Sequence, residues 1–330
     1  MLRDGFVDLQ VNGWQGVDFS TPGLTLEDVR SVVRALASEG TAAFCPTLIT
    51  GPESMYRENL AVLADALEDR ELSRHLLGIH LEGPYLAPAR KGTHDDAKFR
   101  VPDADEIAMA TSLDNGVSLI TLAPEQVPPA SIRAMVERGA IVVAGHTAGS
   151  YDELRGGIDA GITGFTHLYN AMSPLQGREP GAVGAALEDD DCWCGVIVDG
   201  VHVHPASLRV ALAAKPRGKV FLVTDAMPMV GADDPSFDLY GETITAVDGV
   251  VRNAAGALAG SALDMASAVR NSVHLLGLPL DEACRMAAQY PAEFLGIGGE
   301  RGRIVPGYRA DLVLLDCEVR VRRSWIGGWE

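Results

Sequence analysis

The segment LLGIHLEGP, residues 76–84, shows the pattern that decides the fold. Its apolar run is short enough for a buried strand, and Glu82 comes at the end of that run, next to a Gly-Pro turn. Seven further segments share the short apolar run followed by turn residues: FVDLQVN (6–12), TAAFCPTL (41–48), VSLITLAP (117–124), AIVVAGHT (140–147), GFTHLYNA (164–171), CGVIVDGVH (194–202) and VFLVTDAM (220–227). The chain therefore contains eight candidate strands.

Amphipathic helical patterns separate these strands. Examples are residues 26–40, 130–139, 150–161 and 205–215, several of which begin at Ser, Thr or Pro and end at Gly. Eight strands that alternate with helices predict an α/β fold of the TIM-type (β/α)8 barrel class. A doubly wound sheet is the alternative, but no strand is followed by a Gly-x-Gly-x-x-Gly turn. The barrel is favoured because nearly every polar strand residue lies at the C-terminal end, where barrel enzymes form their active sites.

The order of segments predicts one large domain with a small accessory part. We assign residues 4–300 to the barrel, with hairpin strands inserted at about 236–260, where Gly-containing turns separate the segments. Two helices are expected at about 261–277 and 280–290. Residues 301–330 alternate in polarity, as the strands of a small β-layer do.

Composition and charge exclude several classes of partner. The 27 Lys and Arg against 45 Asp and Glu give a net charge of −18, which repels nucleic acid and anionic membrane surfaces. The chain has no uninterrupted apolar stretch of about 18 residues and no signal-peptide core at its start. Its five scattered cysteines favour a reducing compartment, so we expect a cytoplasmic protein.

Cys192 and Cys194 could bind a metal, but the apolar run that follows favours two buried thiols.

Three strand-end residues form a candidate metal site. A catalytic zinc ion takes about three protein ligands from His and carboxylate and keeps one position open. Glu82, His146 and His167 supply that set. A single strand-end histidine is more often a hydrogen-bonded core residue, so the argument depends on the shared position of the three on one rim. His80 points to the same face as Glu82 but lies one layer deeper, so we expect it to support Glu82, with metal binding as the alternative.

Asp225 is the candidate proton-transfer group. Its carboxylate should stay ionised beside a metal cation, take a proton from the attacking water and return it to a leaving amine. An aspartate that starts a turn before Pro228 is the structural alternative. The loop 90–98, which carries His94, and the glycine-flanked Arg178 are expected on the same face, where an arginine can bind a phosphate through two hydrogen bonds.

Most of these residues lie in segments that resemble a known family. The segments are DLQVNG (8–13), HLEGPYLAPARKGTHD (80–95), GHTAG (145–149), THLYNAMSPLQGREPG (166–181), DGVHV (199–203), VTDAMP (223–228), LAGSALDM (258–265) and GRIVPGYRADLVLLD (302–316). Taken in order they resemble the amidohydrolase superfamily and, within it, the N-acetylglucosamine-6-phosphate deacetylases. The resemblance implies hydrolysis of the acetamide of N-acetyl-D-glucosamine 6-phosphate to glucosamine 6-phosphate and acetate, in amino-sugar catabolism and cell-wall recycling.

The resemblance also implies a role for each matching residue. It makes Glu82, His146 and His167 the metal ligands and Asp225 the general acid and base. His94 is implied as the donor of a hydrogen bond to the scissile carbonyl. The substrate phosphate is expected to meet four residues: Asn170, Ala171, Arg178 and His202. In relatives the matching arginine reaches into the neighbouring subunit's site, so the resemblance implies a homodimer.

Two departures from the family pattern change these expectations. The superfamily has His-x-His at the end of the first strand for a second metal, whereas this chain has Gln10 and Asn12. Amides are poor zinc ligands, so we expect one divalent ion per subunit. Zinc is the expected metal, and iron, cobalt and manganese also suit the ligand set.

The chain also enters its first barrel strand almost at once. We therefore expect the accessory layer to lack its N-terminal half, which leaves residues 303–323 with an unpaired edge.

Two other functions remain open on sequence alone. Another amidohydrolase, such as an N-acyl-amino-acid deacylase, would use the same metal centre on a carboxylate substrate, and Arg178 and His202 distinguish the two. A non-catalytic sugar-phosphate-binding barrel is the second, although the intact acid and ligand set argues against it. The expected partner is a phosphorylated amino sugar, with neither nucleic acid nor a membrane.

Overall fold

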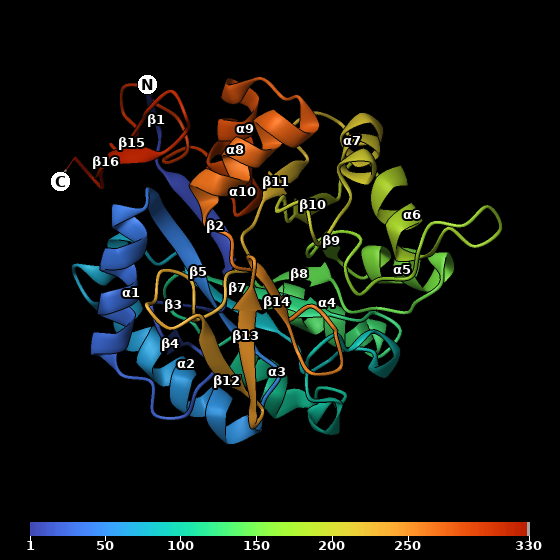
Figure 1. Ribbon diagram of the computed structural model, residues 1–330. Helices are drawn as coiled ribbons and strands as arrows, with labels where there is room; N and C mark the ends of the chain where they lie inside the picture. Colours follow the sequence, from blue (N-terminus) through green and yellow to red (C-terminus); the bar gives the residue numbers. More distant parts are fainter. Residues whose placement is uncertain (329–330) are drawn as a thin grey trace.

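Eight parallel strands form a nearly closed barrel in the computed structural model, which describes residues 1–328 (Figure 1). Within these residues the order around the sheet is β11-β10-β9-β8-β7-β6-β5-β2. The strands are β2 (Phe6–Val11), β5 (Thr41–Ile49), β6 (Gly78–Glu82), β7 (Val117–Leu122), β8 (Ile141–Ala144), β9 (Ile162–Phe165), β10 (Trp193–Val196) and β11 (Val220–Leu222). The predicted TIM-type barrel is confirmed.

Seven of the eight barrel strands end earlier than the sequence predicted, and three of these ends bear on the candidate site. Strands β8, β9 and β11 stop two or three residues before His146, His167 and Asp225. The reason is the backbone conformation, since φ at these residues is +47°, +31° and +53°, which a strand cannot contain. These three side chains therefore lie in the first turn beyond each strand, on the rim of the barrel.

Helices cover the outside of the barrel (Figure 1). They are α1 (Leu26–Ser38), α2 (Glu53–Glu68), α3 (Ala104–Ala110), α4 (Pro129–Glu137), α5 (Tyr151–Asp159), α6 (Gly181–Glu188), α7 (Pro205–Ala214), α8 (Met265–Leu276), α9 (Leu280–Ala287) and α10 (Gln289–Phe294), with single 3-10 turns at Leu72–Arg74, Pro88–Arg90 and Asp96–Lys98. Capping boxes begin α1 at Thr25 and α5 at Ser150, as expected where Ser or Thr precedes an acidic residue by three positions. Among the described residues, no helix is both long and apolar enough to cross a membrane.

The barrel closes between β2 and β11 through few backbone bonds and one buried carboxylate. Backbone pairing there is reduced to an isolated parallel bridge, and the Asp225 N–H donates to the Gln10 carbonyl at 3.0 Å. The Asp8 carboxylate accepts hydrogen bonds from the Thr224 hydroxyl at 2.5 Å and from the Thr224 N–H at 3.3 Å. Burial raises the pKa of Asp8 to about 7. These links hold Asp225 directly opposite the end of β2.

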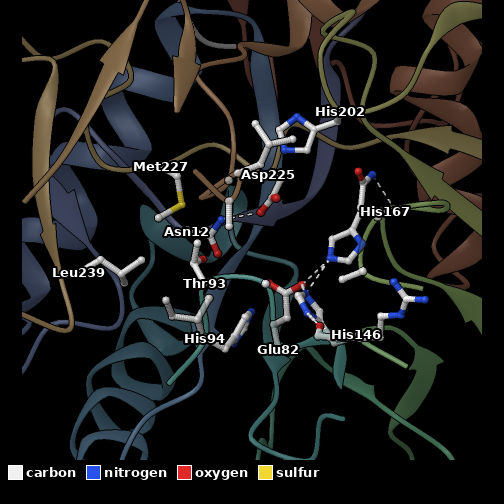
Figure 2. Close-up of a pocket in the computed structure, with 18 of the residues that line it drawn as sticks. Asn12, Glu82, Thr93, His94, His146, His167, His202, Asp225, Met227 and Leu239 are labelled. Atoms are coloured by element: carbon white, nitrogen blue, oxygen red, sulfur yellow. Dashed lines mark hydrogen bonds and ion pairs between the residues drawn. The ribbon is translucent and has the colours of Figure 1, made fainter. Parts of the chain in front are cut away.

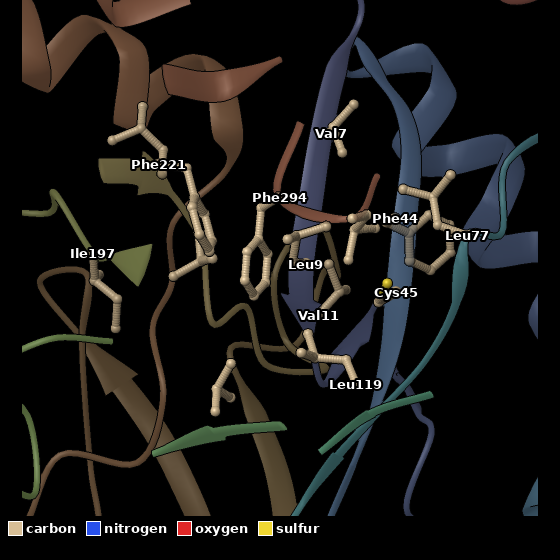
Figure 3. Close-up of a cluster of buried hydrophobic side chains, with 14 of the residues drawn as sticks. Val7, Leu9, Val11, Phe44, Cys45, Leu77, Leu119, Ile197, Phe221 and Phe294 are labelled. Carbon is tan, nitrogen blue, oxygen red and sulfur yellow. The ribbon is translucent and has the colours of Figure 1, made fainter. Parts of the chain in front are cut away.

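The interior of the barrel is filled with apolar side chains (Figure 3). Phe221 of β11 stacks on Phe294 of α10, with ring centroids 5.2 Å apart. Leu9 and Leu119 are also buried. Full burial of such a side chain contributes roughly 1.5–3 kcal/mol. The packed interior leaves the C-terminal ends of the strands as the place where a substrate can bind.

Two small sheets and a short ribbon accompany the barrel. Strands β12 (Ser236–Leu239), β13 (Glu242–Val247) and β14 (Val250–Arg252) form an antiparallel sheet in the segment where hairpin strands were expected. The β3 (Gly13–Trp14) and β4 (Val17–Asp18) strands pair directly after β2. In Figure 1 the β12–β14 sheet, drawn in orange, lies in front of the barrel.

The accessory sheet corrects one expectation. It contains β1 (Leu2–Asp4), β15 (Leu312–Leu315) and β16 (Val321–Trp325), in the order β1-β15-β16. The sequence predicts an accessory layer that lacks its N-terminal half, and only the three-residue strand β1 precedes the barrel. The correction concerns the edge that was expected to be unpaired, because β1 pairs antiparallel with β15 and covers it there. So short a strand carries no periodic signal.

Candidate active site

A cavity of about 320 Å3 opens at the C-terminal ends of the barrel strands (Figure 2). Every sequence-predicted site residue except Arg178 lines it: Glu82, His94, His146, His167, Asn170, Ala171, His202 and Asp225. Leu239 of β12 and the segment after β14, with Leu258 and Gly260, complete the wall on one side. The small β12–β14 sheet thus contributes an apolar wall to a cavity whose chemistry comes from the barrel rim.

Three side chains in the cavity converge on one point. Glu82 Oε1 lies 2.9 Å from His167 Nε2 and 3.3 Å from His146 Nε2, and the two imidazole nitrogens are 3.1 Å apart. Figure 2 shows the three side chains directed toward one another from the ends of β6, β8 and β9. Two imidazole nitrogens and a carboxylate oxygen at such separations match the ligand set of a catalytic zinc site. Within residues 1–328 this is the one cluster of its kind.

The orientation of His146 also fits metal binding. Its Nδ1 lies 2.9 Å from the carbonyl oxygen of Arg90, and a carbonyl can only accept a hydrogen bond. Nδ1 therefore carries the proton, and Nε2 presents a lone pair to the cluster. The left-handed backbone at His146 and His167 costs about 1–3 kcal/mol for each residue. Such conformations concentrate at functional sites, where a side chain must be aimed.

The electrostatics of the cluster favour a charged Glu82. Burial raises its pKa, but the contacts with the rings of His146 and His167 outweigh burial and hold the pKa well below its usual range. Burial lowers the pKa of His167, and the hydrogen bond and negative charge of Glu82 more than compensate. The site therefore contains a fixed negative charge between two imidazoles, which attracts a cation.

Gln10 and Asn12 connect this cluster to Asp225. The Gln10 Nε2 group donates to Glu82 Oε1 and to Asp225 Oδ1, both at 3.1 Å. The Asn12 Nδ2 group donates to the same Asp225 oxygen at 2.7 Å. These amides therefore lie between two carboxylates, where the superfamily pattern expects ligands of a second metal. Because their nitrogens face the carboxylates, they act as hydrogen-bond donors at this position.

Asp225 has the environment of a group that exchanges protons. Burial and the negative charge of Glu82 raise its pKa to about 6. In the described structure only Oδ1 makes side-chain hydrogen bonds, with Gln10 and Asn12, so Oδ2 is free to act in the cavity. A carboxyl group whose pKa lies near neutrality is suited to both accept and donate a proton.

His94 lies next to the metal cluster, and its hydrogen-bond partner, Thr50, is not part of that cluster. Its ring makes an edge contact with His146, with centroids 4.5 Å apart. The Nδ1 atom lies 2.8 Å from the Thr50 hydroxyl, and burial lowers the pKa of His94 to about 3. His94 is therefore neutral at physiological pH and has one N–H to donate.

Of the four residues predicted to bind the phosphate, three line the cavity and one does not. His202 lines the cavity, and its Nδ1 lies 2.6 Å from Asp199 Oδ2. Asn170 and Ala171 line it too, in the loop after β9. Arg178, in contrast, is exposed in the loop before α6 and makes no hydrogen bond or ion pair within the described part of the chain. The structure of one chain therefore does not bring Arg178 to its own cavity.

The structure also decides two other hypotheses from the sequence, on the role of His80 and on metal binding by Cys192 and Cys194. The imidazole of His80 lies within hydrogen-bonding distance of the hydroxyls of Thr121, at 2.7 Å, and Thr47, at 3.3 Å, and it is outside the metal cluster. It forms no hydrogen bond with Glu82 among residues 1–328, so any support is indirect. Cys192 and Cys194 are both buried and free, and burial raises the pKa of each thiol to about 12.

Two residues that hold the site were not predicted from the sequence, Thr50 and Arg90. Thr50, which contacts His94, directly follows β5, so its rim position could have been noticed. The Arg90 carbonyl orients His146 through the main chain, and such a contact has no sequence signal.

The comparisons with known proteins agree with the fold and the cavity. The model of the amidohydrolase family matches residues 5–329, and the chain belongs to this family. It is similar to N-acetylgalactosamine-6-phosphate deacetylase of Shewanella sp. (strain ANA-3), with 42% identity over 99% of this chain and 82% of the relative. It is also similar to N-acetylglucosamine-6-phosphate deacetylase of Bos taurus, with 37% identity over 99% of this chain and 82% of the relative.

Solved structures give the same result. N-acetylglucosamine-6-phosphate deacetylase from Pasteurella multocida is similar with a TM-score of 0.94 and 35% identity, covering 99% of this chain and 85% of that one. A mutant of the Mycobacterium smegmatis deacetylase, solved in complex with N-acetyl-D-glucosamine-6-phosphate, is similar with a TM-score of 0.90 and 34% identity, covering 99% of this chain and 86% of that one. The chain is thus a metal-dependent amidohydrolase whose relatives deacetylate amino-sugar phosphates.

Proposed function

We propose that the protein hydrolyses the acetamide of N-acetyl-D-glucosamine 6-phosphate to glucosamine 6-phosphate and acetate. The observation that carries this proposal is the cavity itself, which combines a three-residue metal cluster, a free carboxylate oxygen and His202. The similarity to deacetylases of this substrate class over 99% of the chain supports it. The reaction belongs to amino-sugar metabolism. It leaves a free amine on the sugar phosphate, on which a later reaction of that metabolism can act.

Each residue has one task in the proposed reaction. Glu82, His146 and His167 would hold a divalent metal, which supplies a Lewis acid for the amide carbonyl and lowers the pKa of water. Asp225 takes a proton from the attacking water through Oδ2 and delivers it to the departing amine. His94 donates its N–H to the carbonyl oxygen as negative charge develops there.

The metal stoichiometry follows from the amides at the end of β2. Gln10 and Asn12 direct their N–H groups toward Glu82 and Asp225, so hydrogen bonds from neutral amides take the place that ligands of a second cation would occupy. We propose one zinc ion per subunit. Iron, cobalt and manganese are the other metals that suit a Glu-His-His ligand set.

The phosphate is assigned to His202 together with Asn170 and the backbone at Ala171. Among the described residues, Arg90 contributes the only guanidinium to the cavity wall, while Arg178 is exposed elsewhere. We therefore propose a homodimer in which Arg178 reaches the cavity of the partner chain. A cytoplasmic location is also part of the proposal, and it agrees with five cysteines that are all free.

The C4 epimer, N-acetyl-D-galactosamine 6-phosphate, is a second candidate substrate. The specific observation in its favour is the 42% identity to N-acetylgalactosamine-6-phosphate deacetylase of Shewanella sp.. Both sugars present the same acetamide and the same phosphate, so the chemistry assigned to the cavity holds for either. A comparison of kcat/KM for the two epimers decides between them.

We expect the enzyme to require the 6-phosphate, and His202→Ala tests why. A hydrogen bond to a charged group contributes about 1.5–3 kcal/mol, so KM for the phosphorylated sugar should rise roughly 10- to 100-fold. KM for unphosphorylated N-acetylglucosamine should change little. His204→Ala is the matched control, because His204 is exposed in the same loop and only caps α7. An enzyme that prefers the unphosphorylated sugar, or an N-acyl-amino acid, would contradict the assignment.

A further inference from the structure

Two histidines of the cavity face different chemical groups through the same ring atom. His146 Nδ1 faces the Arg90 carbonyl oxygen at 2.9 Å, whereas His94 Nδ1 faces the Thr50 hydroxyl at 2.8 Å. A carbonyl only accepts hydrogen bonds, but a hydroxyl can donate one. The two contacts therefore allow opposite tautomers in neighbouring rings. One ring can present a lone pair to a metal, and the other can present an N–H to a substrate.

The burial of Thr50 decides which way its hydroxyl points. Thr50 is 1% exposed, so water is not available to accept its proton. Within residues 1–328 the structure gives the hydroxyl a single hydrogen-bond partner, His94 Nδ1. A buried hydroxyl proton without an acceptor costs about 1–3 kcal/mol, so the hydroxyl donates to Nδ1. In a neutral imidazole the proton then lies on Nε2.

We propose that Thr50 is a positioning residue that fixes His94 as the Nε2–H tautomer and directs this N–H at the carbonyl oxygen of the substrate acetamide. The inference rests on the proposed function, because it explains how His94 acquires the donor role assigned there. His94 lines the cavity, and with Nδ1 bound to Thr50 its Nε2 is the ring nitrogen left for a substrate. A donor held in place before the reaction stabilises the developing oxyanion without reorganisation.

Thr50 is itself held from two sides. A Cβ atom at Gly83, at the end of β6, would lie 2.4 Å from the Thr50 hydroxyl oxygen, so only glycine leaves room for that hydroxyl. The backbone φ of Gly83 is +90°, which also favours glycine. On the other side, the Tyr240 hydroxyl donates to the Thr50 carbonyl at 2.7 Å. The small β12–β14 sheet thereby fixes the main chain of the residue that orients His94.

Two substitutions at Thr50 test the activity part of this inference. Thr50→Val keeps the shape but removes the hydroxyl, and we expect kcat to fall about 10- to 100-fold with KM changed less than a few-fold. Thr50→Ser restores the hydroxyl and should recover most of kcat. Thr243→Val is the matched control and should keep full kcat, because Thr243 is exposed in β13, outside the cavity, and its hydroxyl donates to Asp238. A Val variant with full kcat, or a Ser variant as slow as Val, would overturn the proposal.

The tautomer can be measured without any substrate. In the zinc-loaded protein labelled with 15N-histidine, His94 should show a protonated Nε2 and an unprotonated Nδ1, with its signals assigned by their loss in His94→Gln. Protonation at Nδ1 would refute the inference whatever the activity. If instead neither epimer is deacetylated while Nε2 is protonated, the proposed function fails and the tautomer assignment stands. The two failures are thus distinguishable.

Discussion

Replacing Asp225 with asparagine is expected to lower kcat by about 10²–10⁴-fold while the metal content stays near that of the wild type. The amide oxygen of asparagine can still accept the hydrogen bonds that Gln10 and Asn12 donate to Oδ1. The fold and the closure of the barrel are therefore retained. What is lost is the carboxylate to which the proposed reaction assigns proton transfer from water to the amine. Steady-state kinetics together with metal analysis measures both quantities.

The control for this variant is Asp233→Asn. Asp233 is exposed, and it follows the same strand as Asp225. It is outside the cavity, so full activity is expected. If Asp225→Asn keeps a substantial fraction of wild-type kcat, then proton transfer must be assigned to another group. If it loses the metal as well, Asp225 is a ligand and its assigned role is wrong.

The second large effect is expected for Glu82→Gln. The substitution keeps the shape of the side chain but removes the charge that lies 2.9 Å from His167 Nε2 and 3.3 Å from His146 Nε2. A neutral amide is a poor ligand for zinc, so the metal content should fall from one per chain to near zero. Acetate release should fall to the background, and added zinc should not restore it at concentrations that saturate the wild type.

A matched Glu-to-Gln change separates metal loss from a general loss of stability. Glu282 of α9 is half-buried and pairs with Arg217 and Arg285, far along the chain from the cavity residues. Glu282→Gln should lower the unfolding temperature yet keep one metal per chain. A Glu82→Gln variant that still binds zinc as tightly as the wild type would contradict the ligand assignment.

The sequence predicted much of the site because its chemistry lies at strand ends. Buried apolar runs reveal strands, and a histidine or carboxylate at the end of such a run lies on the rim of a barrel. Glu82, His146, His167 and Asp225 were found in this way, and the structure brings them into one cavity. The strand bounds were less accurate, because left-handed φ values at the last three of these residues end the strands early.

Other contacts could not be predicted, for identifiable physical reasons. The hydrogen bond between Thr50 and His94 joins residues 44 positions apart, and the tautomer that it sets depends on burial, which a single sequence does not show. The Arg90 carbonyl acts through the main chain, so residue type gives no signal. Strand β1 is too short for periodicity. Arg178 lies outside the cavity of its own chain, and in the proposed homodimer it would reach the cavity of the partner chain.

In the proposed function, this barrel deacetylates an amino-sugar phosphate with one metal ion. The most direct test is acetate release from N-acetyl-D-glucosamine 6-phosphate, and from its C4 epimer, by protein stripped of metal and then titrated with zinc. We expect no acetate from the stripped protein, full recovery at one zinc per chain, and equal amounts of acetate and free amino sugar. No acetate from either epimer at any zinc loading, or undiminished release by the stripped protein, would contradict it.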